Sequence, residues 1–462
     1  MSRLAVMATL LLVSPAFAQT PRGNGPGMQP LPLPAGARVL TLAEAERLLM
    51  ERNLLVVAAQ RGVDAARAQR LVASSRPPAQ VSAGNTFGEF RETRNNGVQG
   101  ARFFGPNTNV QVGLTVLIEL GGKRTLRTRL AEEQIGVAEA QVLDAMRGQI
   151  FALRQSFISA LGARANLEVA VANRGSLDRT EALLRRQLQD GALPEGDLLR
   201  FQASRLPFEA EVTSAAQSYA AAVSQVAVTL AIDAATVAPS RLASLPAVAI
   251  DVRGRLDTMA EPGVSRGELA DAVQNRADVV AAARAAAAGA ANTSLAEAQR
   301  WRDVTLNGGW TRSQLSQDAP TSTQPLIANN QFGFSLSVPI FNGQIVRGQI
   351  GQAAGQQAQL EAQARAALLQ GRADFATAWA SYEQSRALLR LLNGGALARA
   401  EMAYRSAEQA YLAGGRSLLD VLDALRTLNA TRFAANNARA AYLTALAQLE
   451  FATGVSGIAP RL

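Results

Sequence analysis

Two segments of the chain alternate between apolar and polar or small side chains, the pattern of a β-strand whose two faces meet different surroundings. The apolar positions are Val110, Val112, Leu114, Val116 and Ile118 in the first segment and Phe332, Phe334, Leu336, Val338 and Ile340 in the second. Weaker alternating segments precede them at residues 79–93 and 303–313. We therefore predict two β-hairpins with long polar loops.

Much longer segments have helical periodicity. Residues 123–189 and 344–412 contain no proline, and at ~1.5 Å per residue each reaches about 100 Å as a single helix. Heptad-like apolar positions are Met146, Ile150, Leu153, Phe157, Ala160, Leu167 and Val171 in the first segment and Leu368, Phe375, Trp379, Tyr382 and Leu389 in the second. Arg164 interrupts the first series, and Arg372 and Arg386 interrupt the second. Because an average helix has about a dozen residues, this length favours a coiled coil over an ordinary soluble bundle.

The same order of elements occurs twice, at a shift of about 223 residues. Gly191 aligns with Gly414, and Asp197 aligns with Asp420. Helices at 42–74 and 266–298 precede the strands, and helices at 197–231 and 417–453 follow a glycine-marked break. We predict a first repeat over 41–235, a connector over 236–264 that is irregular, a second repeat over 265–455 and a tail over 456–462.

The N-terminal residues have the features of a secretory signal peptide. Arg3 supplies a positive charge, residues 4–13 are apolar except Thr9, and Ala16-Phe17-Ala18 is a small-x-small cleavage site. We predict cleavage after residue 18, followed by an extended segment over 19–40. No later stretch has 18 apolar residues in a row, so we expect no transmembrane helix in the mature chain.

Four strands of about ten residues match the span of an outer-membrane barrel but are too few to close one, since closure takes at least about eight. Open strand edges are not tolerated in lipid. The chain is then expected to pool strands with copies of itself, and three copies give twelve strands around a pore. The alternative is a small soluble hairpin that caps a helical bundle.

Composition excludes several kinds of chemistry. The chain has no cysteine and no histidine, which excludes thiol catalysis, disulfides, histidine-ligated metal sites and Ser-His-Asp triads. Its carboxylates show no metal-ligand spacing, and we predict no cofactor, no metal site and no enzymatic activity. The formal charge of +9 is spread mostly as arginine along helices. Without clustered basic and stacking residues it does not indicate nucleic-acid binding, whereas contact with an acidic adaptor or with anionic headgroups stays open.

Three local motifs carry a resemblance to a known family. They are Leu117-Ile-Glu-Leu-Gly-Gly-Lys-Arg124, Asp197-Leu-Leu-Arg-Phe-Gln-Ala203 and Tyr411-Leu-Ala-Gly-Gly-Arg-Ser-Leu-Leu-Asp-Val-Leu-Asp-Ala424. With the two-fold repeat, they resemble the TolC-type outer-membrane efflux proteins along essentially the whole mature chain. The first motif is similar to that of the heavy-metal branch, which includes the cobalt-zinc-cadmium outer-membrane component.

The resemblance implies a mainly α protein with a small membrane β-barrel. It implies a homotrimer with a twelve-stranded barrel in outer-membrane lipid and an α-helical coiled-coil tunnel in the periplasm. A periplasmic adaptor (membrane fusion) protein and an inner-membrane pump of the resistance-nodulation-division type are the implied partners. The implied function is an exit duct of a tripartite efflux system, with heavy-metal cations as the expected substrate. The alternatives are a channel for drug efflux or type I protein secretion, and a soluble periplasmic coiled-coil adaptor.

The resemblance also implies a gate at the helical tips that closes like an iris. Asp420 and Asp423 would form carboxylate rings, Tyr411 and Arg416 would make closing contacts, and Asp197 would partner one of these two. Residues three apart share a helix face, and a carboxylate ring favours cations. Three of these residues also have a structural alternative: Asp420 has N-cap spacing from Ser417, Arg416 could be a solvated loop cation, and Tyr411 a packing residue.

Overall fold

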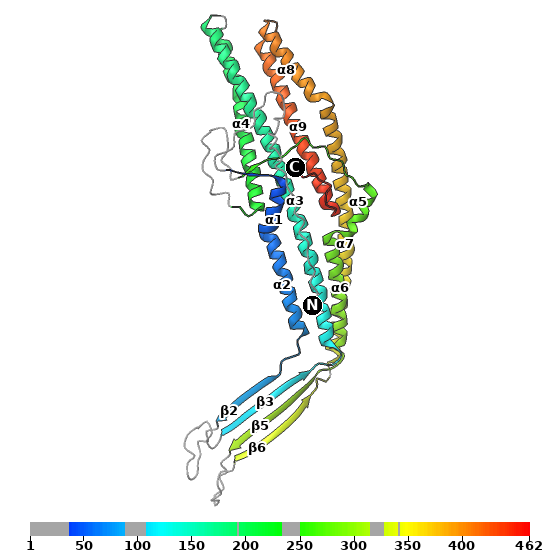
Figure 1. Cartoon of the computed structure of the whole chain (residues 1–462). Coiled ribbons are helices and arrows are strands. Elements are labelled where there is room, and N and C mark those ends of the chain that lie inside the picture. Colours follow the sequence, from blue (N-terminus) through cyan, green and yellow to red (C-terminus); the bar gives the residue numbers. More distant parts are fainter. Residues whose placement is uncertain (1–36, 88–107, 192–193, 233–249, 315–327, 341) are drawn as a thin grey trace, which may run out of the picture.

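The chain forms an elongated bundle of helices with a sheet at one end and two helical hairpin tips at the other (Figure 1). The computed structural model describes residues 37–87, 108–191, 194–232, 250–314, 328–340 and 342–462. The predicted signal peptide at 1–18 and most of the extended segment at 19–40 lie outside the described residues. None of the helices in the described ranges contains a stretch that is apolar and long enough to cross a bilayer.

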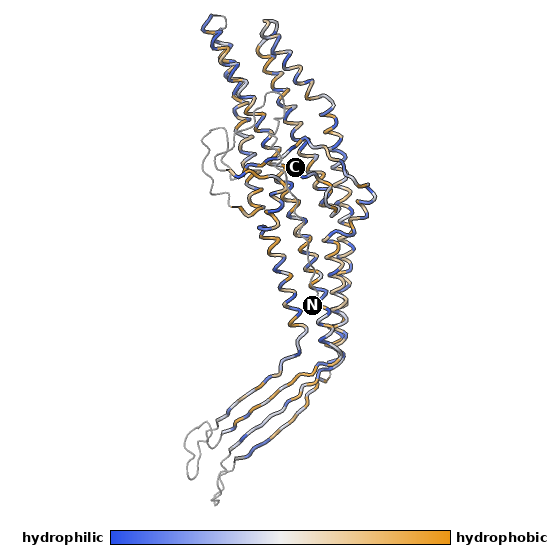
Figure 2. Tube along the Cα trace, in the orientation of Figure 1, coloured by the Kyte–Doolittle hydropathy of each residue, from blue (hydrophilic) through white to orange (hydrophobic). Residues whose placement is uncertain are grey.

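Helices of both halves run along the bundle. The first half contains α1 (Leu42–Arg52), α2 (Leu54–Ser74), β2 (Gln80–Phe87), β3 (Thr108–Ile118), α3 (Lys123–Gln189) and α4 (Glu195–Thr229). The second half contains α5 (Arg266–Ala272), a 3₁₀ turn (Val273–Asn275), α6 (Ala277–Ala298), β5 (Val304–Gln314), β6 (Ala328–Ser337), α7 (Gly343–Leu391), a π segment (Leu392–Ala396), α8 (Leu397–Leu412) and α9 (Leu418–Thr453). Apolar and polar residues are interspersed along these elements (Figure 2).

The four long strands form one antiparallel sheet in the order β2-β3-β5-β6. The two predicted hairpins are confirmed, and pairing of β3 with β5 joins the two halves. The register aligns Val112 with Trp310, and Trp310 with Phe332, so apolar residues of three strands share one face. The other face carries amides, hydroxyls and glycines together with Leu117, and Arg312 lies on the apolar face opposite Val110. Within the described strands, the sheet is therefore amphipathic across both halves.

The two longest helices differ. The predicted helix over 123–189 is confirmed as α3, whereas the prediction of one continuous helix over 344–412 is wrong. A π segment separates α7 from α8, and Gly394 and Gly395 have non-helical dihedrals, with φ of 100° at Gly395. Glycine adopts positive φ without a steric penalty, so a glycine pair can break a helix that contains no proline.

The two shorter predicted helices are also broken, at equivalent positions. Asn53 separates α1 from α2; its side chain caps α2 and donates a hydrogen bond to the carbonyl oxygen of Thr229 at 2.9 Å. Arg276 lies between the 3₁₀ turn and α6 and donates to the carbonyl oxygen of Ala452 at 3.2 Å. In both halves, the residue at the helix break is thus hydrogen-bonded to the C-terminal end of a later helix, α4 in the first half and α9 in the second.

The main apolar core lies midway along the bundle, where the connector crosses it. The connector is not wholly irregular, because β4 (Ile250–Val252) pairs in parallel with β1 (Arg38–Leu40). The contacts of Arg164 explain why a charged residue interrupts the heptad series. Arg164 is buried, forms an ion pair with Asp251 and donates a hydrogen bond to the carbonyl oxygen of Val252 at 3.0 Å. The Tyr219 hydroxyl donates a second hydrogen bond to Asp251 at 2.7 Å.

The second half binds the other end of the connector with equivalent residues. Arg386 forms an ion pair with Glu261, and the Tyr442 hydroxyl donates to the carbonyl oxygen of Ala260 at 2.5 Å. Arg164 and Arg386, which occupy equivalent positions in the two heptad series, therefore both bind the connector. The first attachment is buried, whereas the Glu261 side chain of the second is exposed.

Replacing Asp251 by alanine should destabilise the fold, because Arg164 would remain as an uncompensated buried charge. We expect a loss of about 3–5 kcal/mol, seen as a lower thermal unfolding temperature of the purified protein. Asp257→Ala is the matched control, since Asp257 pairs with Arg255 at the surface and its loss should change stability by less than about 1 kcal/mol. Equal effects of the two substitutions would contradict the assignment.

The same pair predicts a pH dependence. Burial opposes ionisation of Asp251, but the hydrogen bond and charge of Arg164 outweigh it and hold the pKa of Asp251 below its ordinary value of 3.8. A depressed folded-state pKa stabilises the protein fully above the unfolded-state pKa, and this contribution is lost as the pH falls through the folded-state value. Unfolding free energy should therefore fall below about pH 4 more steeply in the wild type than in Asp251→Ala.

Candidate functional site

The candidate site comprises the two hairpin tips, which lie at the end of the molecule opposite the sheet (Figure 1). Gly191 follows α3 with φ of 71°, and Gly414 follows α8 with φ of 74°. The amide N–H groups of Gly414 and Gly415 donate to the carbonyl oxygens of Tyr411 and Ala410 at 2.9 and 2.8 Å. Both helices therefore end in a left-handed glycine, which satisfies terminal carbonyls and lets the chain reverse.

Asp420 forms a capping box at the start of α9. Its carboxylate accepts hydrogen bonds from the backbone N–H and the hydroxyl of Ser417, at 3.2 and 3.0 Å, and its own N–H donates to the Ser417 hydroxyl at 3.4 Å. The side chain remains exposed. Asp423 lies three residues on, is also exposed, and forms no ion pair with any described residue. The capping alternative for Asp420 thus holds, and both carboxylates still face solvent in the single chain.

The tips bring Tyr411 and Asp197 together. Tyr411 is partly buried against an apolar cluster, and burial followed by the negative charge of Asp197 raises the pKa of its hydroxyl. Asp197 also lies 3.8 Å from Arg200 on its own helix. Arg416 is exposed and forms no ion pair with the part of the chain that the structure describes. Asp197 is therefore close enough for its charge to act on the Tyr411 hydroxyl across the repeats, whereas Arg416 has no ion-pair partner among the described residues.

An apolar cluster beneath the tips links the two hairpins. Its buried members are Leu177, Leu184, Leu198, Phe201 and Phe208 from α3 and α4, with Leu422 and Leu425 from α9. Tyr404, Tyr411 and Leu418 pack against it. Tyr411 is thus a packing residue as well as a neighbour of Asp197, and movement of the second hairpin would have to separate these surfaces.

A network of ion pairs within the first hairpin was not predicted. Arg205 of α4 bonds to Glu181 of α3 at 2.5 Å, to Glu209 at 2.8 Å and to Asp178. A hydrogen bond from Gln202, with those from Arg205 and Arg185, holds the pKa of Glu181 below its ordinary value despite some burial. The four-residue spacing of Arg205 and Glu209 indicates an ion pair on one helix. The bonds from Arg205 to α3 could not be predicted, because their partners are distant in the sequence.

The second hairpin is joined less extensively. Arg432 of α9 forms an ion pair with Glu401 of α8 at 3.1 Å, and no other ion pair joins these two helices among the described residues. Its outer helix also follows the glycine break at Gly394 and Gly395, whereas α3 is continuous. The two hairpins are therefore equivalent in order but differ in how firmly they are held.

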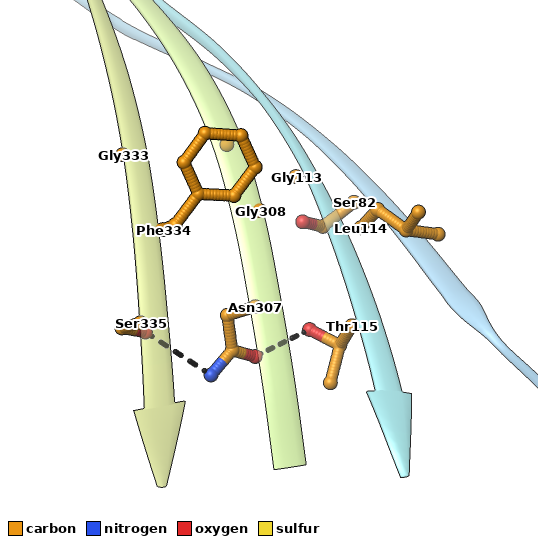
Figure 3. Close-up of a pocket in the computed structure, with 10 residues that line it drawn as sticks. Ser82, Gly113, Leu114, Thr115, Asn307, Gly308, Gly333, Phe334 and Ser335 are labelled. Atoms are coloured by element: carbon orange, nitrogen blue, oxygen red, sulfur yellow. Dashed lines mark hydrogen bonds between the residues drawn. The ribbon is translucent and has the colours of Figure 1, made fainter. Parts of the chain in front are cut away.

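The polar face of the sheet forms a second distinctive surface. Thr115 donates its hydroxyl hydrogen to Asn307 at 2.9 Å, and the Asn307 amide donates to Ser335 at 3.3 Å (Figure 3). A hollow beside this row is lined by Ser82, Gly113, Leu114, Thr115, Asn307, Gly308, Gly309, Gly333, Phe334 and Ser335. No group of three or more potential metal-ligating side chains gathers anywhere in the described ranges.

Part of the chain matches a known protein family. Residues 269–455 match the family described as outer membrane efflux protein. A curated relative is nodulation protein T of Rhizobium leguminosarum bv. viciae, 25% identical over 336 residues that cover 70% of this chain and 64% of the relative. The alignment thus spans less than two thirds of that protein's length.

Solved structures share the fold across most of the chain. CusC, whose structures concern transmembrane channel formation, superposes with a TM-score of 0.69 at 17% identity, covering 89% of this chain and 92% of its own. The open-state outer membrane channel MtrE of Neisseria gonorrhoeae gives a TM-score of 0.67 at 20% identity, covering 90% and 89%. At these identities the superpositions establish the fold.

The family match and the shared fold agree with each other: both relate this chain to outer-membrane channel proteins. The resemblance to TolC-type outer-membrane efflux proteins that the sequence predicts is confirmed, as a family match over residues 269–455 and as a shared fold over most of the chain. The matches do not single out the heavy-metal branch, which stays a prediction.

Replacing Ser417 by alanine removes the N-cap of α9 but keeps the charge of Asp420. We expect the first turns of α9 to lose about 1 kcal/mol of local stability, measured as faster amide hydrogen exchange over residues 418–425. Ser406→Ala, at an exposed position within α8, should leave this exchange unchanged. Unchanged exchange in Ser417→Ala would contradict the capping role.

Proposed function

We propose that the protein is the exit duct of a tripartite efflux system. In this proposal, three copies form a twelve-stranded barrel in the outer membrane and a helical tunnel in the periplasm. The duct passively conducts substrates that an inner-membrane pump of the resistance-nodulation-division type delivers through a periplasmic adaptor. The single observation that carries the proposal is a four-stranded amphipathic sheet with two open edges, continuous with a bundle of very long helices.

The apolar face of the sheet supports insertion into lipid. On β6, Phe332 and Phe334 are 75% and 90% exposed in the single chain. Large apolar side chains that are this exposed and lie side by side indicate a surface that is covered by lipid or by another protein. β2 and β6 form the edges, and neither outer edge has a strand partner among the described residues. Because backbone groups in lipid must be paired, edges of neighbouring copies would pair to complete the wall.

The polar face supports a water-filled lumen. The described strands present amides, hydroxyls and glycines on this face and no charged side chain. Hydrogen bonds through Asn307 order part of this surface. An alternation of lipid-facing apolar and lumen-facing polar residues is the pattern of outer-membrane barrels with a pore.

The tips support a gate that opens by movement of the second hairpin. The first hairpin is held by the Arg205 network, whereas the second has one ion pair and a glycine break in its outer helix. Separation of Tyr411 from Asp197 would accompany opening, and Arg416 is available to contact a neighbouring copy. Asp420 and Asp423 would line the constriction, where carboxylates favour cations such as heavy-metal ions.

The assembly itself is the first test. Detergent-solubilised protein should have the mass of three chains and should open conducting pores in planar bilayers. A monomer that dissolves in plain buffer would contradict the duct and favour the soluble adaptor. For substrate, a gene deletion should sensitise cells to heavy-metal salts; sensitivity to drugs alone, or a defect in protein secretion, would assign the channel to those substrates instead.

Removing the tip carboxylates should reduce cation preference. Asp420→Asn with Asp423→Asn eliminates two negative charges per chain, so the reversal potential in a salt gradient should shift towards that of a non-selective pore. Ser417→Ala is the matched control, since it weakens the cap but retains both charges. Selectivity unchanged in the double variant would remove these residues from the pore.

A further inference from the structure

Exposed arginines gather where the helices meet the sheet. The four connections, taken with the adjoining helix turns, occupy residues 75–79, 119–129, 297–303 and 338–347, where the helices meet the sheet (Figure 1). They contain eight basic and three acidic residues, an excess of five positive charges within a chain whose formal charge is +9. We define the arginine collar as the exposed members Arg76, Arg124, Arg129, Arg300, Arg302 and Arg347.

Two of the three acidic residues in these segments form ion pairs with Lys123 and Arg127, which are not members of the arginine collar. Lys123 is buried and bonds to Asp303 at 2.8 Å, and Arg127 forms an ion pair with Glu119. No collar arginine forms an ion pair with any described residue. The collar therefore presents its positive charge to the surroundings, and internal pairing does not account for it.

The collar borders the apolar face of the sheet. Arg302 lies two residues before Val304, where that face begins on β5, and Arg124 is the second residue of α3. Arg129 and Arg347 lie within about 9 Å of the starts of α3 and α7, at ~1.5 Å per residue. Trp301 is 64% exposed between Arg300 and Arg302, next to Gly121, where a Cβ would lie 2.5 Å from its ring. Tryptophan beside basic residues is typical of a membrane–water interface.

We propose that the arginine collar binds anionic phospholipid headgroups of the periplasm-facing leaflet of the outer membrane. This inference rests on the proposed function, because it takes the apolar face of the sheet to lie in lipid. A phosphate diester accepts the paired N–H groups of a guanidinium, and basic residues near an anionic bilayer surface each strengthen binding. The binding would fix the depth of the sheet in the membrane.

Charge and placement favour lipid over an acidic protein partner. The collar draws residues from two connections beside the strands and from the first turns of α3 and α7, so it borders the whole width of the sheet. A lipid leaflet meets that entire border at once. The collar also lies at the sheet end of the helical bundle, away from the tips (Figure 1).

The test compares a collar variant with a variant of equal charge. The collar variant carries Arg76→Gln, Arg124→Gln, Arg300→Gln and Arg302→Gln. The control carries Arg52→Gln, Arg365→Gln, Arg372→Gln and Arg405→Gln, four exposed helical arginines away from the sheet that form no ion pair with described residues. Full-length purified proteins are titrated with phosphatidylglycerol and with phosphatidylcholine in detergent, and bound lipid is counted by native mass spectrometry.

Wild type and control should bind phosphatidylglycerol more tightly than phosphatidylcholine, and the collar variant should lose at least about tenfold of this preference. No preference in the wild type, or an equal loss in both variants, would overturn the proposal. Pore formation in phosphatidylcholine bilayers is measured in parallel. If the protein forms pores but binds both lipids equally, only the lipid-binding role of the arginine collar is overturned. If it forms no pores in any bilayer, the proposed function is overturned as well.

Discussion

The antiparallel ladder between β3 and β5 is the constraint on which the shape of the molecule depends. It joins the two halves from Asn109–Ser313 to Ile118–Val304, at the only level where both halves contribute to one sheet in the described chain. A slip of one residue would turn the apolar set of one half to the opposite face. The sheet would then carry mixed faces. The register of β3 and β5 therefore determines that the two halves form one amphipathic sheet.

The pattern of apolar and polar residues was sufficient to predict the helices and strands whose buried positions recur at regular intervals. The alternation at Val110–Ile118 predicted β3, and the heptad positions predicted α3, because each pattern arises from the local geometry of strand or helix. The breaks at Asn53 and Arg276 depend on carbonyl groups at the ends of α4 and α9, which are distant in sequence. Arg164 likewise has no local explanation, since Asp251 of the connector is its partner.

The candidate site divides in the same way. The capping box of Ser417 and Asp420 is visible in the spacing of the sequence, and the structure contains it. The proximity of Tyr411 and Asp197 was expected only through family resemblance, because it depends on how the two hairpins pack. The Arg205 network, which differentiates the hairpins, could not be predicted, since two similar repeats give no local sign of which one is tied more firmly.

One small feature of the sheet bears on how a cylinder begins to form. Gly113, Gly309 and Gly333 lie side by side in the register, beside Ser82, and a Cβ at Gly113 would come within 2.8 Å of the Ser82 hydroxyl. A strip without side chains lets strands bend towards it without crowding. In the proposed trimer, this strip would let each four-stranded sheet curve towards its polar face before neighbouring copies pair.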